Sequence, residues 1–359
     1  MKFDAVLPPM HLKDVPSVAQ AAEAMGFDAL WTTETQHNAF LPQALIAEHT
    51  EKIEMGTAVA ISFARSPGDI AYTAWDLAAQ SNGRFILGLG TQVKGHITKR
   101  FGMEWPASVV GKLREQIGAV RALWRTWQTG EKLNFNGDYY KLRLMTPFFN
   151  PGPLPAPTPS PSPASGRGAS VPPASGGETK GGLGLIPIYI AGVNTGLARL
   201  AGEVCEGFHA HPFNSPRYLR EVLTPAIEEG ADKTGRTRAD VSVSLTAFIA
   251  TTPEEANQAR MQISFYASTP SYRRVMEHYG WGEVAAQLTG HAAKGEWAEM
   301  PMLITDEMLA EFVTLADSPA DLPAALKKRY GGIVDRITVY TPFVPGEKDD
   351  FWREMVKAF

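Results

Sequence analysis

The chain has 359 residues, a formal net charge of -4 and a sequence pI near 6.1. This slightly acidic balance gives no reason to expect nucleic acid or an anionic membrane surface as a partner. The N-terminus lacks the cationic start and long apolar core of a signal peptide, and no apolar run approaches the roughly 18 residues of a membrane span. The sequence therefore predicts a cytoplasmic protein.

The first part of the chain alternates short apolar strands with amphipathic helices. One helix has Pro16 near its start and Gly26 where a C-terminal cap belongs, and a second helix begins near Pro67. Each lies between two apolar runs of strand length, which is the pattern of parallel strands joined by helices. The strands predicted in this part are residues 3–7, 28–32, 53–62 and 84–90.

The pattern changes after residue 90. A long amphipathic helix over 110–127 is followed by an extended excursion around the turn Asn136-Gly137. Residues 151–184 are rich in Pro, Gly and Ser and contain almost no large apolar side chain, so they cannot bury enough surface to offset the entropy of ordering. We expect a disordered insertion there, with no catalytic role.

Strands resume after this stretch, over residues 186–192, 207–211, 242–250 and 335–340. Eight strands in a strand-helix rhythm favour a closed TIM (β/α)8 barrel over a doubly wound sheet. We expect one barrel domain over residues 1–359, with insertions after strands 4 and 7. The second insertion is rich in helix formers and aromatic residues, and the sequence leaves open whether it shapes the substrate pocket or forms a subunit interface.

The loops that follow the strands of a barrel carry its active site, and here they exclude several mechanisms. A metal hydrolase needs paired histidines after the first strand, where only His11 is present. Lys94 lies too far along its loop to form a Schiff base at a strand end. The single Cys205 lies at helical spacing from apolar residues and cannot form a cysteine-based zinc site. The sequence therefore predicts no metal site.

Two glycine-containing turns are candidates for binding a phosphate. Gly88-x-Gly90 would need a third glycine at position 93 to open a dinucleotide-binding turn, and that residue is Val93. The stretch GVNTG (192–196) runs from a strand into a helix, where backbone N–H groups and the helix dipole favour an anion. The same residues would also make an ordinary tight turn. A planar, phosphate-bearing cofactor fits the second turn.

Four stretches carry a family resemblance: GFDALWTTET, the run from MGTAVAISFARSP to GRFILGLGTQ, IPIYIAGVNTGLARLAGEVCEGFHAHPF, and LKKRYGGIVDRITVY. In order and spacing they resemble the bacterial luciferase-like flavin superfamily, and within it the oxidoreductases that use the deazaflavin coenzyme F420. The resemblance implies a TIM barrel with insertions that transfers a hydride between F420 and a small organic substrate. We expect a homodimer or higher homo-oligomer, with no nucleic-acid or membrane partner.

The resemblance also implies where the ring of the cofactor lies. It places a non-prolyl cis peptide in the third strand, at Ala58-Val59 or an immediate neighbour, where it supports the central ring. The polar edge of the ring then lies near the ends of the second and fourth strands, at Glu34, Thr35 and Thr91. We expect Gln92 to extend into the pocket beside Thr91. Gly88 and Gly90 are interpreted as small residues at a place where bulk would collide with the ring.

The phosphate site implied by the resemblance lies in the second half of the chain. Its residues are Gly192, Val193 and Asn194 after the fifth strand, and His211, Pro212 and Phe213 after the sixth. His211 either donates to the phosphate or is a satisfied structural histidine. A bulky residue in place of Gly192 is expected to block the phosphate and weaken cofactor binding.

The acid and base groups differ from the pattern of the family. Some of its F420 enzymes have an Asp-His pair where this chain has Glu34-Thr35, and an acidic residue where this chain has Gln92-Val93. The candidate proton donors are Glu34, His37 and His96. Two alternatives stay open: an FMN-dependent monooxygenase in the same barrel, and a flavin- or deazaflavin-binding protein without turnover, which the missing pair allows.

Overall fold

The computed structural model describes residues 1–155 and 186–359. Of the Pro-, Gly- and Ser-rich stretch for which an insertion is predicted, residues 156–184 lie outside the described residues. Within the two described ranges, every helix is too short or too polar to span a bilayer.

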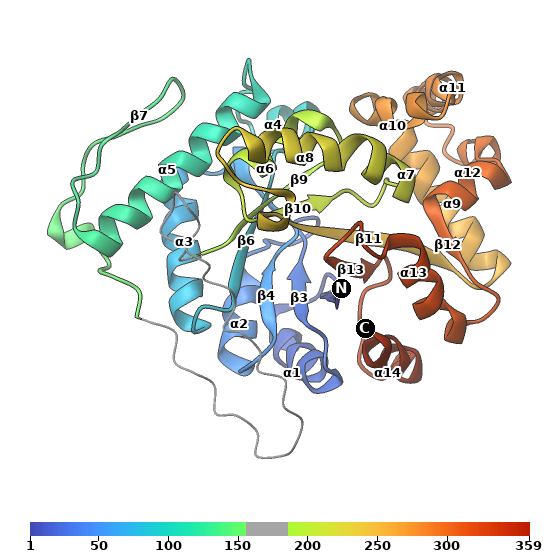
Figure 1. Ribbon diagram of the computed structural model, residues 1–359, viewed down its shortest axis with the longest axis horizontal. Coiled ribbons are helices and arrows are strands. Elements are labelled where there is room, and N and C mark those ends of the chain that lie inside the picture. The colour runs from blue at the N-terminus through green and yellow to red at the C-terminus, as the bar shows by residue number, and fades with distance from the viewer. Residues whose placement is uncertain (156–185) are drawn as a thin grey trace. The chain divides into compact units, whose positions relative to one another are not determined.

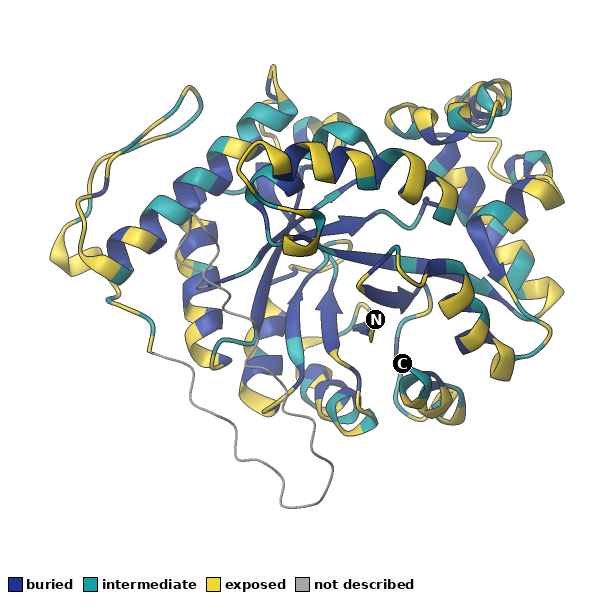
Figure 2. Cartoon of the chain, viewed as in Figure 1, coloured by how far each residue is buried: buried dark blue, intermediate teal, exposed yellow. Residues whose placement is uncertain are grey.

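Mostly parallel strands form one sheet (Figure 1) in the order β1-β13-β11-β10-β9-β6-β4-β3-β2, with β5 beside β6 and β12 beside β11. This is the nearly closed sheet of a TIM barrel, as the strand pattern predicts. The strand residues are buried almost throughout (Figure 2), as in parallel strands covered on both faces. The strands are β1 (Lys2–Phe3), β2 (Ala5–Val6), β3 (Ala29–Thr32), β4 (Glu54–Thr57), β5 (Ala60–Ile61), β6 (Phe85–Gly90), β9 (Ile188–Gly192), β10 (Gly207–Ala210), β11 (Ser242–Ala250), β12 (Val313–Leu315) and β13 (Arg336–Val339).

All eight predicted strands are present, but two of them are interrupted. The first breaks at Asp4, between β1 and β2, and the third breaks at Ala58-Val59, between β4 and β5. The sequence pattern does not predict α2 (Leu41–His49) or α4 (Lys94–Lys99), because each is too short to show a clear apolar period.

The described residues group into two compact units. The N-terminal unit comprises Leu7–Ala24 and Ala29–Tyr189, and the C-terminal unit comprises Met1–Val6, Met25–Asp28 and Ile190–Phe359.

Two helices of the N-terminal unit pack against each other through tryptophans. Trp124 Nε1 donates to Ala71 O at 3.1 Å, and the rings of Trp127 and Trp75 meet edge to face at 5.3 Å. These residues belong to α3 (Pro67–Gln80) and α5 (Val109–Thr129), so the predicted apolar face of the long helix is core. Its remaining elements are α1 (Val15–Met25), α2, α4, and the antiparallel pair β7 (Phe135–Asn136) and β8 (Lys141–Leu142).

Glycines allow two helices of the C-terminal unit to approach closely. A Cβ on Gly202 would lie 1.9 Å from Ile227 O, and one on Gly230 would lie 1.9 Å from Arg199 O. The same unit buries an ion pair, in which Arg336 donates to Asp4 at 2.8 and 2.9 Å. The helices of this unit are α6 (Thr195–Val204), α7 (Pro216–Tyr218), α8 (Thr224–Asp232), α9 (Pro253–Ala267), α10 (Arg273–His278), α11 (Gly282–Lys294), α12 (Asp306–Phe312), α13 (Leu322–Tyr330) and α14 (Asp349–Ala358).

Candidate active site

The end of β4 in the N-terminal unit carries the irregular backbone that the resemblance predicts. The Ala58-Val59 peptide bond is cis. Both residues are partly exposed, whereas Thr57 before them and Ala60 after them are buried. The cis bond therefore presents its backbone at a strand end, where barrel enzymes bind their ligands.

Side chains bond to this segment where it interrupts the ladder between β4 and β6. The Thr57 hydroxyl donates to Gly88 O at 2.6 Å, and the Gly88 N–H donates back to the same hydroxyl at 3.0 Å. Gln43, which is fully buried on α2, donates from Nε2 to Gly56 O at 2.7 Å. These bonds satisfy backbone groups that would otherwise be buried without partners.

Glu34, one of the predicted proton donors, is held in an ion pair. Arg65 donates to its two oxygens at 2.7 and 2.5 Å, and the Ile61 N–H donates to it at 2.6 Å. Arg65 also donates to Ile61 O at 2.9 Å, and the Arg65 and Glu34 side chains are only 12% and 7% exposed. Hydrogen bonds between a guanidinium and a carboxylate are among the strong ones in proteins. Glu34 therefore fixes the backbone just after the cis bond, and both of its oxygens are already engaged by donors.

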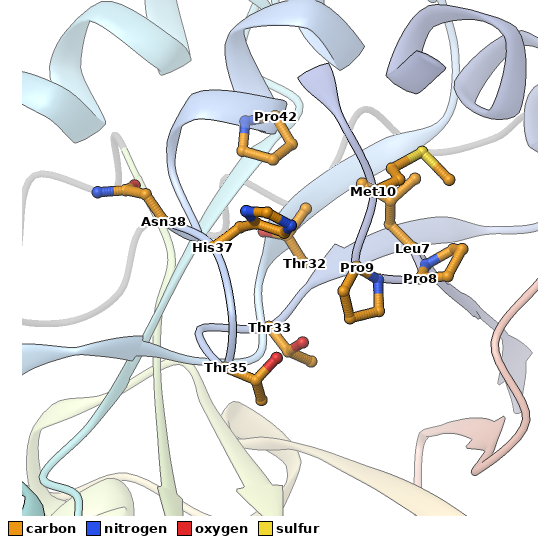
Figure 3. A pocket seen from close by; sticks show the side chains of 10 residues that line it. All are labelled: Leu7, Pro8, Pro9, Met10, Thr32, Thr33, Thr35, His37, Asn38 and Pro42. Atoms are coloured by element: carbon orange, nitrogen blue, oxygen red, sulfur yellow. The ribbon is translucent and has the colours of Figure 1, made fainter. Parts of the chain in front are cut away.

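His37 lies on the loop after β3 and lines a narrow pocket (Figure 3). The loop after β2 forms one wall, and Thr33 and Thr35 line the pocket together with His37. The imidazole is exposed and makes no hydrogen bond with any residue that the structure describes. The full lining is Leu7, Pro8, Pro9, Met10, Thr32, Thr33, Thr35, His37, Asn38 and Pro42.

The residues after β6 include an unusual backbone conformation. Thr91 is buried, and Gln92 has φ 58°, in the left-handed region that residues other than glycine rarely adopt. A Cβ on Gly90 would lie 2.4 Å from Val59 Cγ2. The expectation that bulk at Gly90 would meet a flat ring is corrected, because a side chain there would first collide with Val59 beside the cis bond.

His96, the third predicted proton donor, lies on the short helix α4. Its side chain is exposed and lines a groove with Lys99 and Arg100, and this groove shares no lining residue with the pocket of His37. The structure therefore does not bring the three predicted proton donors to one place: one is ion-paired, one lines the narrow pocket, and one lies on an exposed helix.

Asn194, in the C-terminal unit, begins α6 without capping it. Its backbone has the extended conformation of an N-cap residue, but its side chain makes no capping hydrogen bond. Its Nδ2 instead donates to Ser271 O at 2.8 Å, and its Oδ1 is buried with no partner among the described residues. The first-turn N–H groups of α6 therefore receive no cap from this side chain, and a buried acceptor lies beside them.

Gly192 has a packing role besides the phosphate role predicted for it. A Cβ there would lie 2.8 Å from Leu197 Cβ and 3.1 Å from the ring of Phe208. The glycine is thus required by packing within its own unit, and a bulky substitution would disturb this packing before it reported on a phosphate. Val193 is also buried, with 4% of its surface exposed.

The ring of His211 has a defined tautomer. Its Nδ1 accepts from the Phe213 N–H at 3.0 Å, so the proton of the neutral ring is on Nε2. The rings of Tyr266 and Tyr272 lie at 4.6 and 4.7 Å from it. Burial among these groups lowers the pKa of His211 to about 3, so the ring is neutral and can donate through Nε2.

Phe213 belongs to the core. Its side chain is fully buried and stacks on Phe312 with ring centroids 4.7 Å apart. The ring has no surface left for a cofactor, and its N–H is already donated to His211. Pro212 beside it is half-buried.

Sequence reasoning misses Gln43 and Arg65. The Arg65 guanidinium bonds to a carboxylate 31 residues away in the chain, a distance at which no local pattern reports the contact. The available signal is that Arg65 lies within the stretch FARSP that carries part of the family resemblance.

Comparison with known sequences gives a family and several relatives. The family model described as luciferase-like monooxygenase matches residues 3–336. An uncharacterised protein of Mycobacterium tuberculosis is 40% identical over 346 residues, covering 94% of this chain and 92% of that protein. An F420-dependent glucose-6-phosphate dehydrogenase of Microbacterium testaceum is 28% identical over 247 residues, covering 65% of this chain and 62% of that enzyme.

Solved structures share the fold. The coenzyme F420 dependent tetrahydromethanopterin reductase of Methanopyrus kandleri aligns with a TM-score of 0.74 and 19% identity, covering 99% of this chain and 97% of that one. The oxygenating constituent of the type II Baeyer-Villiger enzyme 3,6-diketocamphane monooxygenase of Pseudomonas putida, in complex with FMN, aligns with a TM-score of 0.65 and 16% identity, covering 100% and 97%. At these identities the alignments establish the fold alone.

Proposed function

The chain belongs to the luciferase-like monooxygenase family, and we propose that it is an oxidoreductase that transfers a hydride between coenzyme F420 and a small organic substrate. The observation that carries this proposal is the break between β4 and β5, where Ala58 and Val59 are partly exposed at a strand end and the central ring would lie. The likeness to an F420-dependent dehydrogenase supports F420 over FMN.

The C-terminal unit offers groups that fit the polar chain and phosphate of such a cofactor. The uncapped N–H groups of α6 and the Nε2–H of His211 are donors suited to phosphate oxygens. Asn194 Oδ1 is an acceptor, so it suits a hydroxyl of the polyol chain better than an anionic phosphate oxygen. These residues would bind the polar chain and the phosphate of the cofactor.

F420, when bound, supplies or accepts the hydride, and the protein fixes the distance and excludes water. Among the three candidate proton donors, His37 is favoured because its imidazole has no partner among the described residues, whereas the Glu34 carboxylate is ion-paired. The Thr33 and Thr35 hydroxyls line the same pocket and can bind an oxygen of the substrate. His37 would then exchange a proton with that oxygen.

A binding titration tests the choice of cofactor. The purified apo-protein is titrated with F420 and, separately, with FMN, and the change in cofactor fluorescence is followed. We expect saturable binding of F420 and much weaker binding of FMN. Tight FMN binding without F420 binding would overturn the proposal and favour the monooxygenase alternative.

Turnover separates an enzyme from a binding protein. Reduced F420 bound to the protein is mixed with small ketones and aldehydes, and oxidised F420 is mixed with the corresponding alcohols. We expect at least one pair to change the redox state of the cofactor faster than the same mixture without protein. Binding without any such change would favour a non-catalytic role.

A further inference from the structure

The helix α4 and the residue after it concentrate positive charge in an acidic protein. The segment from Thr91 to Met103 contains Lys94, Lys99 and Arg100 and no Asp or Glu, although the chain as a whole has a net charge of -4. Lys99, Arg100 and His96 line one open groove, together with Val93 and Gly95. Repulsion between these neighbouring charges is a cost that an anion in the groove would remove.

The fold does not compensate these charges. In the part of the chain that the structure describes, neither Lys99 nor Arg100 forms an ion pair, and both are exposed. Arg100 donates one N–H to Thr35 O at 2.6 Å and lies 5.0 Å from the centre of the Phe101 ring. These two contacts restrain the guanidinium without neutralising it, so less side-chain entropy remains to be lost when a ligand binds.

The pocket of His37 differs from this groove in the charge of its lining. Its ten lining residues include no Lys or Arg. An anionic part of a ligand therefore finds complementary charge on α4 and none in the walls of that pocket.

We propose that the groove of Lys99, Arg100 and His96 binds a carboxylate or phosphate group. Charge-assisted hydrogen bonds from the ammonium and the guanidinium hold the anion, and the His96 imidazole adds a further donor. This reassigns His96 from proton transfer to anion binding. The anion has two candidate sources, the acidic tail of F420 and an acidic group of the substrate. In naming these sources, the inference rests on the proposed function.

The test uses the double variant Lys99→Gln/Arg100→Gln, with Lys94→Gln as the matched control, because Lys94 lies on the same helix and does not line the groove. The full-length variants are titrated with F420 and with the deazaflavin nucleoside that lacks phosphate and glutamates. Two exposed charge pairs of about 0.7 kcal/mol each predict a loss of roughly tenfold in affinity. If the tail is the anion, F420 loses this affinity and the nucleoside does not.

A second arm identifies the other source. Inorganic pyrophosphate and citrate are titrated into the wild-type and variant apo-proteins by calorimetry. If the anion belongs to the substrate, these probes bind the double variant more weakly while F420 binds as before. Equal affinity of wild type and double variant for F420, pyrophosphate and citrate would overturn the proposal that the groove binds an anion. Absence of F420 binding to the wild type would overturn the proposed function, and the pyrophosphate and citrate titrations would still decide the groove.

Discussion

Two sets of charged residues in the N-terminal unit differ in burial and in ion pairing. Glu34 and Arg65 are nearly buried and form an ion pair with each other. Both also bond to the backbone of Ile61, Glu34 to its N–H and Arg65 to its carbonyl oxygen. Lys99 and Arg100 are exposed and have no acidic partner among the described residues. The contrast shows that residue type alone does not identify a functional side chain. The role of a charged or titratable side chain depends on whether the fold already provides it with hydrogen-bond or ion-pair partners. The Glu34 carboxylate has hydrogen-bond partners and fixes the backbone at Ile61. The His37 imidazole and the charged groups of Lys99 and Arg100 keep donors that a ligand can use.

Breaking the satisfied pair should have the largest effect. Arg65→Ala leaves the Glu34 carboxylate nearly buried without its cation, and such a loss costs about 3–5 kcal/mol of unfolding free energy. Urea denaturation measures this cost, and the exposed Arg125→Ala serves as the control. A cost below about 1 kcal/mol, as for surface pairs, would show that the pair does not hold the segment.

Removing the unsatisfied imidazole should affect turnover instead of stability. His37→Gln is expected to lower kcat by about 100-fold, the ordinary contribution of a general acid or base, with little change in the midpoint of urea denaturation. Steady-state kinetics with the substrate found by the turnover assay measures the effect. An unchanged kcat would remove His37 from proton transfer.

Glu34→Gln provides the comparison within the same loop. The amide keeps an acceptor for the Ile61 N–H but removes the charge opposite Arg65. We expect the pH dependence of kcat to keep its shape, because both oxygens of Glu34 are already engaged by Arg65 and Ile61. Loss of one limb of the pH profile in Glu34→Gln would restore Glu34 as a proton donor.

A buried histidine in the C-terminal unit differs from both sets, because burial keeps it neutral. The pKa of His209 is lowered to about 3 by burial and by the charge of Arg336, so the folded protein keeps it neutral. An unfolded histidine has a pKa of about 6.5, so below that pH only the unfolded chain takes up the proton. The contribution of His209 to the unfolding free energy is therefore undiminished above that pH, and it falls by about 2 kcal/mol on acidification to pH 5.

Urea denaturation at several pH values measures this dependence. His209→Gln should reduce the loss between neutral and mildly acidic pH and leave the part due to His211, whereas the exposed His49→Gln should leave the loss unchanged. An unchanged pH dependence in His209→Gln would show that the slope comes from other groups.

The smallest effect on stability is expected on α4. Lys99→Gln/Arg100→Gln removes exposed charges that no described acid opposes, so the unfolding free energy should change by less than about 1 kcal/mol. The same denaturation measurement, compared with Arg65→Ala, sharpens the contrast between satisfied and unsatisfied charges. A large destabilisation would mean that α4 charges support the fold.

The sequence predicts the architecture well because apolar strand runs and helix caps are local signals. The positions of all eight strands and of the cis Ala58-Val59 bond agree with expectation. The sequence does not predict the helix α4, on which the candidate proton donor His96 lies, because so short a helix has no clear apolar period.

The contacts of the site are harder to predict because they depend on residues distant in the chain. The Glu34–Arg65 pair joins two loops, and Gly90 is explained only by the Val59 side chain that fills its space. Asn194 is similar: the sequence places it only in a turn between a strand and a helix. The structure adds that its amide nitrogen bonds to Ser271 O and that its oxygen has no partner among the described residues.

The central claim is that the cis segment after β4 supports the ring of F420. A crystal structure of the protein with oxidised F420 tests it most directly. We predict the central ring against Ala58 and Val59, with the Glu34–Arg65 pair intact. A ring bound elsewhere would contradict the account.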